Sequence, residues 1–258
     1  NAKFNWRKNQ LRLSYARGFR APSLKELYLD FTDSNHELEG NPDLEAENSH
    51  NFNLAYHFNT KIKRRPFDAK FTLFYNQIFN QIKLIQVDPG NAIHYRNENI
   101  EGQSESLGGT VGFTVNPLEF MSLELAYSNT GVRYNSSDPK DIYFNSDAVA
   151  NMVFLFLQNT LSVSINYKYV GAYPNLTNFS EDGTFEVFML DSYHNLDVNL
   201  SKKFFNNSLT IGTGVKNIFD NVQIQSSGGG HGGSSGASGL IGWGRTAYVS
   251  LKYNFIKF

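Results

Sequence analysis

The stretch that decides the fold is residues 11–49, LRLSYARGFRAPSLKELYLDFTDSNHELEGNPDLEAENS. It opens with LRLSY, in which apolar and polar residues alternate, and a period of two is typical of a β-strand. We expect this strand to break at Gly18, because Pro22 soon afterwards cannot continue a hydrogen-bonded ladder. A polar loop follows, bends again at residues 40–42, and gives way to a second strand near Ser49.

The same alternation recurs along the rest of the chain and predicts ten strands in all. In the second strand, Phe52, Leu54 and Tyr56 share one face, while Asn51 and Asn53 lie on the other. The strands are expected at about residues 9–17, 49–58, 67–85, 94–115, 121–130, 146–157, 161–169, 196–201, 209–215 and 247–255.

The connections between these strands alternate in length. Those near 59–66, 116–120, 158–160 and 205–208 are short, and those near 18–48, 86–94, 131–145, 171–192 and 217–245 are mostly longer and polar. Short turns at one end and long loops at the other are typical of an outer-membrane β-barrel. A soluble β-sandwich also has alternating strands, but nothing sorts its loop lengths by end. The sorting therefore favours an all-β, antiparallel transmembrane barrel.

The composition agrees with this class and excludes others. Of the 258 residues, 40% are hydrophobic and 15% aromatic, yet no apolar run approaches the roughly 18 residues that a membrane helix needs. A negative mean hydropathy is compatible with a barrel, because half of each strand faces a polar interior. The net charge of −1, without a basic block, gives no support to nucleic-acid binding. The absence of cysteine excludes disulfides and thiol chemistry.

Three segments, GFRAPSLKELY, GNPDL and AENS, resemble the paired sequence boxes of TonB-dependent outer-membrane receptors. KNIFDN at 216–221 and the aromatic SLKYNF near the C-terminus resemble further segments of that family, although three residues extend past the expected terminal aromatic. The resemblance implies a barrel of 22 strands with a plugged lumen, of which this chain would supply about ten C-terminal strands. The box residues are Phe19, Arg20, Ala21, Pro22, Asn41, Pro42, Asp43 and Leu44.

The resemblance also sets the expected domain organisation and partners. No signal peptide precedes Asn1, and the sequence begins a few residues before a strand, so we expect a piece of a longer polypeptide. Residues 1–258 would be the C-terminal portion of the receptor barrel in the bacterial outer membrane, with the plug domain absent from this chain. The implied partners are the N-terminal plug and remaining barrel of the same receptor, the TonB complex through that plug, and a surface lipoprotein.

His36 is the main candidate for ligand binding. In haem receptors of this family a histidine lies between the two boxes, as His36 does here. A neutral imidazole can ligate haem iron, so we expect His36 to be an axial ligand of transported haem; the alternative is a solvent-exposed loop histidine. His94 and Tyr95, at a predicted loop–strand junction, are candidates for the same pocket. No permanently bound cofactor is expected.

Other polar groups have simpler explanations. The acidic residues of the first long loop lack the spacing of an EF-hand, so a solvated loop is preferred to a calcium site. His231 lies in the glycine-rich run 226–239, which predicts a mobile loop or a linker-like insertion rather than a phosphate cradle. His50, His57 and His194 lie in or beside strands, which favours lumen or interface roles over ligation. No spacing indicates a catalytic triad or carboxylate pair, so no enzyme is expected.

The resemblance thus implies active import of haem or a related iron porphyrin by a TonB-dependent receptor. A ferric siderophore and cobalamin are the alternative ligands. A passive porin-like or adhesin barrel is the alternative without energy coupling, and a plug with a TonB-contacting segment before Asn1 would eliminate it. A soluble β-rich module that binds carbohydrate through Tyr and Trp is the third class.

Overall fold

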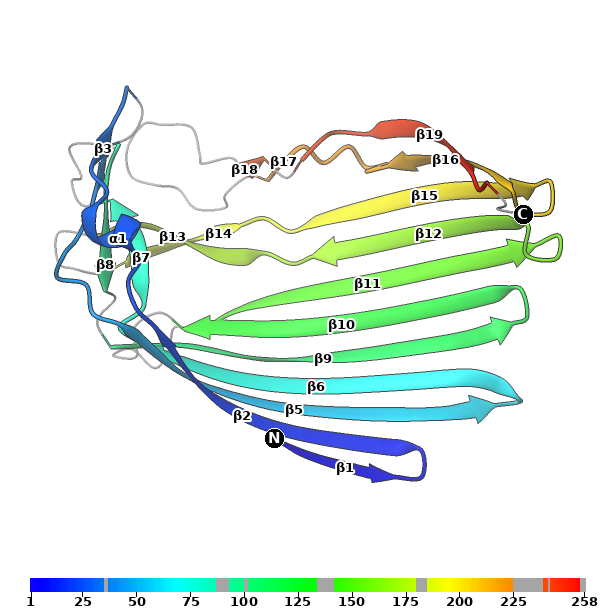
Figure 1. Ribbon diagram of the computed structural model, residues 1–258, viewed down its shortest axis with the longest axis horizontal. Helices are drawn as coiled ribbons and strands as arrows, with labels where there is room; N and C mark the ends of the chain where they lie inside the picture. The colour runs from blue at the N-terminus through cyan, green and yellow to red at the C-terminus, as the bar shows by residue number, and fades with distance from the viewer. Residues whose placement is uncertain are drawn as a thin grey trace.

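The computed structural model describes residues 1–34, 37–86, 93–99, 102–133, 142–179, 185–224, 239–240 and 242–255. Its main feature is an 11-stranded antiparallel sheet that curls into an open trough (Figure 1). In spatial order, which is also chain order, the strands are β1 (Ala2–Trp6), β2 (Asn9–Arg20), β5 (Glu47–Ile62), β6 (Arg65–Phe79), β9 (Gln103–Leu118), β10 (Met121–Arg133), β11 (Ile142–Phe156), β12 (Leu161–Val170), β15 (Tyr193–Phe204), β16 (Leu209–Lys216) and β19 (Thr246–Tyr253).

Figure 1 confirms the sorting of connections by length. Short turns join the strands at one end of the trough, here called the turn end, and the long connections gather at the opposite loop end. The turn between β5 and β6 consists of Lys63 and Arg64, whose φ angles are 48° and 67°. Positive φ at both central residues matches the twist of the flanking strands, so this turn closes a tight hairpin.

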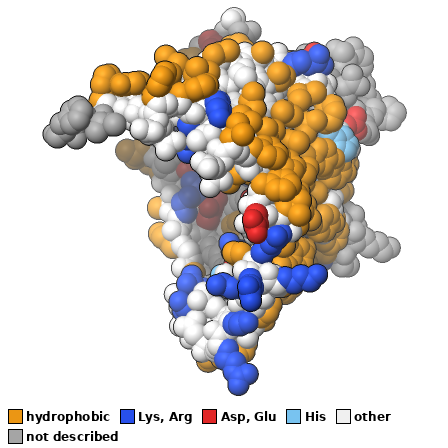
Figure 2. Space-filling model, turned by 90° about the vertical axis from the view of Figure 1, so that its right-hand side faces the viewer, with side chains coloured by type: hydrophobic (Ala, Val, Ile, Leu, Met, Phe, Trp, Pro, Cys, Tyr) orange, Lys and Arg blue, Asp and Glu red, His pale blue; other side chains and the backbone are white. Residues whose placement is uncertain are grey.

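The two faces of the sheet differ in polarity, as the alternation predicts. Leu11, Tyr56 and Phe71 are register partners in one row, and Gln10, His57 and Lys70 form the adjacent row on the opposite face. Figure 2, viewed from the turn end, shows hydrophobic side chains over the outer flank and charged side chains inside the hollow. We call these the outer face and the lumen face.

Little of the chain forms a conventional core. Among the described residues no large side chain is fully buried, and the buried apolar set is small: Leu44, Ile82, Ile85, Val170 and Leu190. Outer-face residues such as Phe52 and Leu73 remain 46% and 44% exposed. Such a sheet gains stability when its outer face meets a lipid phase. The described helix is also too short to cross a membrane.

The long connections contain structure of their own. The first holds helix α1 (Leu24–Tyr28), β3 (Phe31–Thr32) and β4 (Glu37–Glu39), and the second holds β7 (Ile82–Gln86) and β8 (His94–Asn99). These four strands form one sheet in the order β3-β4-β8-β7, in which β4 and β8 are parallel. The predicted loop at 171–192 contains the hairpin β13 (Tyr173–Phe179) and β14 (Phe185–Leu190), and β17 (Gln223–Ile224) pairs with β18 (Gly239–Leu240).

Four boundary predictions are corrected. The first strand does not break at Gly18 but continues to Arg20; a Cβ at Gly18 would lie 2.4 Å from the Ser49 side-chain oxygen, so glycine permits close pairing there. The third strand ends at Phe79 instead of residue 85, because Asn80 turns with φ 54°. The fourth is divided into β8 and β9. The edge strand β1 was not predicted at all.

Candidate functional site

The predicted box residues lie at the loop end, where helix α1 starts directly after β2. Ser23 is the N-cap of this helix: its hydroxyl accepts a hydrogen bond from the Glu26 amide at 3.3 Å, and the Glu26 carboxylate accepts one from the Ser23 amide at 2.7 Å. This reciprocal capping box satisfies two amides that a helix start leaves unpaired. The sequence SLKE therefore fixes a turn of helix immediately after Pro22.

Arg20 joins both ends of the first long connection. Its guanidinium donates hydrogen bonds of 2.8 Å to both Glu47 carboxylate oxygens and of 2.9 Å to Glu26. Glu47 also accepts the backbone amide of Ile82 at 2.8 Å, which ties β7 to the same point. A planar guanidinium suits such paired contacts, because its donors match the carboxylate geometry. The first box and the AENS segment thus form one polar cluster, here called the Arg20 cluster.

The charges in this cluster hold Glu26 ionised. Burial alone would raise the pKa of the Glu26 carboxyl, but the hydrogen bond from the Ser23 amide and the contact with Arg20 together lower it further than burial raises it. The net result is a pKa below the usual value for glutamate. Hydrogen bonds and a nearby cation both favour the charged form of a carboxyl. Glu26 therefore remains a charged partner for Arg20 at neutral pH.

The second box fastens the connection to the small sheet. Asn41 is only 3% exposed, and its side-chain amide donates to the Asn97 carbonyl at 2.9 Å and to the Glu98 carboxylate at 3.0 Å. Its side-chain oxygen accepts the Asp43 amide at 3.1 Å. The Asn41 backbone amide donates to the Glu26 carbonyl at 2.9 Å. One asparagine thus connects α1, β8 and its own turn.

The remaining box residues have little contact chemistry. Phe19 is 72% exposed, Leu44 is buried, and Ala21, Pro42 and Asp43 are all exposed. Pro22 is half-buried next to the helix cap. The boxes therefore lie at the loop end, and among their residues Arg20 and Asn41 make the side-chain hydrogen bonds that join its segments.

Of the three predicted ligand-binding residues, His94 and Tyr95 lie in β8. His36 lies outside the described residues. His94 begins β8, and its Nε2 lies 3.1 Å from the Glu39 carboxylate, while Tyr95 pairs with Leu38 across the parallel β4–β8 ladder. The two cavities described below are lined by other residues. Among the described residues there is no group of three or more His, Asp or Glu side chains that could hold a metal ion.

The other strand histidines are paired within the sheet. His57 on the lumen face contacts the Asp68 carboxylate through its Nε2 atom. His50 and His194 lie on the outer face, with their Nδ1 atoms 2.8 Å and 2.7 Å from the hydroxyls of Tyr15 and Tyr167.

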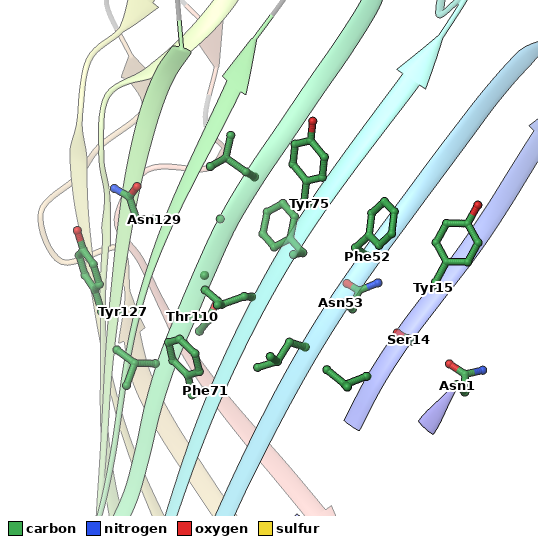
Figure 3. A pocket seen from close by; sticks show the side chains of 18 of the residues that line it. Asn1, Ser14, Tyr15, Phe52, Asn53, Phe71, Tyr75, Thr110, Tyr127 and Asn129 are labelled. Carbon is green, nitrogen blue, oxygen red and sulfur yellow. The ribbon is translucent and has the colours of Figure 1, made fainter. Parts of the chain in front are cut away.

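The larger cavity is a groove of about 1060 Å³ over β2, β5, β6, β9 and β10. Figure 3 shows the side chains of Tyr15, Phe52, Phe71 and Tyr75 projecting from neighbouring strands at this groove. These side chains belong to the outer face, which is the apolar one. A hollow in an apolar outer face suits hydrocarbon chains better than a polar solute, so we do not assign the candidate solute site to it.

The smaller cavity, of about 560 Å³, opens on the lumen face near the loop end. It lies over β12, β15 and β16 and is bounded by residues 217–221 and 242–246. Two lysines, Lys168 and Lys216, line it together with Tyr193 and Trp243. We call it the Lys168 cavity. Sequence reasoning missed these residues, although KNIFDN contains Lys216 and alternation places Lys168 on the lumen face.

The comparisons with known proteins agree with this architecture. Residues 2–218 match the family model described as TonB dependent receptor-like, beta-barrel. "Probable hemoglobin and hemoglobin-haptoglobin-binding protein 1" of Haemophilus influenzae is 31% identical over 89 residues, which cover 33% of this chain and 8% of that protein.

Solved structures of receptors share the fold at low identity. The FrpB iron transporter from Neisseria meningitidis has a TM-score of 0.66 at 15% identity, over 98% of this chain and 38% of that one. The siderophore receptor PirA from Pseudomonas aeruginosa has a TM-score of 0.66 at 19% identity, over 96% and 40%. The Serratia marcescens hemophore receptor HasR, solved with its hemophore HasA and heme, has a TM-score of 0.65 at 14% identity, over 96% and 37%. This chain thus spans less than half the length of each of these relatives.

Proposed function

This chain belongs to the family of TonB-dependent receptor-like β-barrels, and from that premise we propose that it forms the C-terminal part of a receptor that imports haem or a related iron complex. The family is one of outer-membrane receptors and transporters rather than enzymes. The observation that carries the proposal is the family match over residues 2–218, because it covers ten of the eleven strands of the trough, all except β19.

Haem is the ligand that the remaining observations support best. His36 lies between the two boxes, and an imidazole is a good axial ligand for haem iron. The relative that is 31% identical over 89 residues is named for binding hemoglobin, a haem protein. Both observations favour an iron porphyrin over a ferric siderophore or cobalamin, which stay as the alternative ligands.

The proposed mechanism assigns this chain a passive but necessary part. Ligand would bind the loop end and the outer surface of a plug supplied by the N-terminal part of the receptor. TonB would then act on that plug and open a passage past the lumen face. The Arg20 cluster would hold together the two ends of the first long connection, in whose sequence His36 lies. A surface lipoprotein that hands over ligand remains a further proposed partner.

Uptake assays with the complete receptor test this function. We expect it to restore growth on haem as the only iron source in a host that lacks its own haem receptor, and to lose that ability when TonB is deleted. Haem uptake that persists without TonB would instead identify a passive barrel. Growth on a ferric siderophore but not on haem would overturn the ligand and leave the receptor class in place.

A further inference from the structure

The Lys168 cavity has the chemistry of an anion site on an otherwise mixed lumen wall. One uninterrupted row of register partners crosses the lumen face from Gln10 through His57 and Lys70 to Lys168 and Asn195. The row therefore places the Lys168 side chain in the hollow that the trough encloses. A solute that travels along the lumen face, parallel to the strands, crosses this row.

The wall of the cavity is built by the KNIFDN segment. Asn217 adopts φ 51°, a left-handed conformation that asparagine tolerates better than most residues. Its side-chain amide donates to the carbonyls of Asn221 and Trp243 at 3.0 Å and 3.2 Å, and its backbone amide donates to the Asp197 carboxylate at 2.8 Å. The Asp220 carboxylate accepts the Arg245 amide at 2.6 Å. These bonds hold residues 217–221 against 243–245.

The charge balance of the cavity favours an anion. Within the described part of the chain neither Lys168 nor Lys216 forms an ion pair, and Lys216 Nζ lies 5.6 Å from the centre of the Tyr248 ring. Asp197 is the acidic residue in the lining, and it already accepts the Asn217 amide. Two ammonium groups thus share the lining with one carboxylate, one oxygen of which already accepts a hydrogen bond.

The aromatic side chains of the cavity indicate the shape of its ligand. Trp243 is 92% exposed at the rim, and Tyr193 lies in the same lining. Exposed aromatic rings beside cationic groups suit a flat apolar ligand with an acidic edge. The volume of about 560 Å³ also lies within the roughly 300–1,000 Å³ of small-molecule sites.

We propose that the Lys168 cavity binds the carboxylate edge of the transported ligand, with Lys168 and Lys216 each donating to a carboxylate and Trp243 covering the flat face. This proposal rests on the function proposed above and adds the acidic edge of the porphyrin as the feature that is recognised. Haem carries two carboxylates on one edge, so one lysine is available for each.

The test compares haem with haem dimethyl ester, in which both carboxylates are neutral, on the complete purified receptor. We expect wild type to bind haem more tightly than the ester. Lys168→Gln and Lys216→Gln should each weaken haem binding by about tenfold and leave ester binding unchanged, because only the charged carboxylate needs the ammonium. Lys168→Arg should retain most of the haem affinity. The visible spectrum of bound haem should not change, since neither lysine is proposed to touch the iron.

Lys70→Gln is the matched control, because Lys70 lies in the same lumen row but 3.7 Å from the Asp68 carboxylate and outside the cavity. It should bind haem like wild type. If the double variant Lys168→Gln, Lys216→Gln binds haem normally, or loses haem and ester equally, this inference is overturned while haem import stands. A wild-type receptor that binds neither compound would instead overturn the proposed function itself, and this inference with it.

Discussion

The guanidinium of Arg20 donates hydrogen bonds of 2.8 Å to both carboxylate oxygens of Glu47, from Nε and from Nη2. The two residues are also register partners at the last rung between β2 and β5. The pair therefore closes the loop end of this hairpin at the point where the long connection leaves and returns. In this chain the contact joins the GFRAP segment directly to the AENS segment.

Arg20→Lys should loosen the first long connection. Lysine keeps the charge but cannot make the paired contact with Glu47, and Arg20 is 43% exposed, so we expect a cost of about 1 kcal/mol for local opening. Limited proteolysis of the complete receptor should then cut residues 21–46 roughly fivefold faster. Arg17→Lys, on the same strand and without a described ion pair, is the control. Equal rates of cleavage in both variants would show that the Arg20 cluster does not hold the first long connection in place.

Gly40→Ala should disturb the second box. A Cβ at Gly40 would lie 2.7 Å from the Leu27 carbonyl oxygen and 2.8 Å from Tyr28 backbone atoms, and backbone gives way less easily than a flexible side chain. We expect a cost of about 1–3 kcal/mol, seen as faster proteolysis of the first long connection and weaker ligand binding. Gly112→Ala is the matched control, since its Cβ would find nothing closer than 3.7 Å. If Gly40→Ala left both the proteolysis rate and ligand binding at wild-type values, the GNPDL box would not need a glycine at this position.

The sequence could predict which face of the sheet each side chain lies on. This is because side chains alternate between the faces wherever a strand begins or ends. Phe52, Leu54 and Tyr56 share one face in the structure as predicted, and the register with β6 extends that face to Phe71 and Leu73. A shift of one residue would have reversed every side chain, so the pattern specifies the register strongly.

The loop end could not be read in the same way. The even-numbered apolar residues Ile78, Ile82 and Leu84 continue one alternation, yet Asn80 turns left-handed between them and β7 joins a different sheet. The Lys168 cavity brings Lys168 into one lining with residues far along the chain, such as Trp243, and no local sequence pattern reports that arrangement. Box motifs indicated the family, while the partners of Arg20 emerged only from the folded arrangement.

Leu73→Arg should be far more damaging than Asn53→Arg. Leu73 lies on the apolar outer face and Asn53 on the lumen face of the neighbouring strand, so only the first substitution would place a charge in lipid. The expected cost is about 2–4 kcal/mol if Leu73 lies near the midplane of the membrane. Denaturant titration of the receptor folded into lipid vesicles measures this difference. Similar losses from both variants would show that the two faces are assigned wrongly.

Residues 1–258 should not form a closed transporter by themselves. In the described sheet β1 pairs only with β2, and β19 pairs only with β16, so two edges keep unpaired backbone groups. Each such group costs several kcal/mol in the hydrocarbon region of a membrane. When it is refolded alone in detergent, the chain should lack the heat-modifiable mobility of a closed barrel, and the complete receptor should show it. A stable, closed barrel of these residues alone would refute the expectation that the N-terminal part of the receptor completes it.

His36→Ala should weaken haem capture if the proposed axial role is right. The prediction rests on the position of His36 between GFRAP and GNPDL, in the connection that the Arg20 cluster fastens at both ends. Loss of an imidazole changes the ligand field of the iron, so haem-dependent growth should fall and the absorption spectrum of bound haem should shift. His57→Ala, on the lumen face and paired with Asp68, is the control and should retain the wild-type spectrum. Normal growth on haem and an unchanged spectrum in His36→Ala, with equal receptor abundance, would remove His36 as the ligand. A siderophore or cobalamin would then become the better candidate, and the membership of the chain in the receptor family would be unaffected.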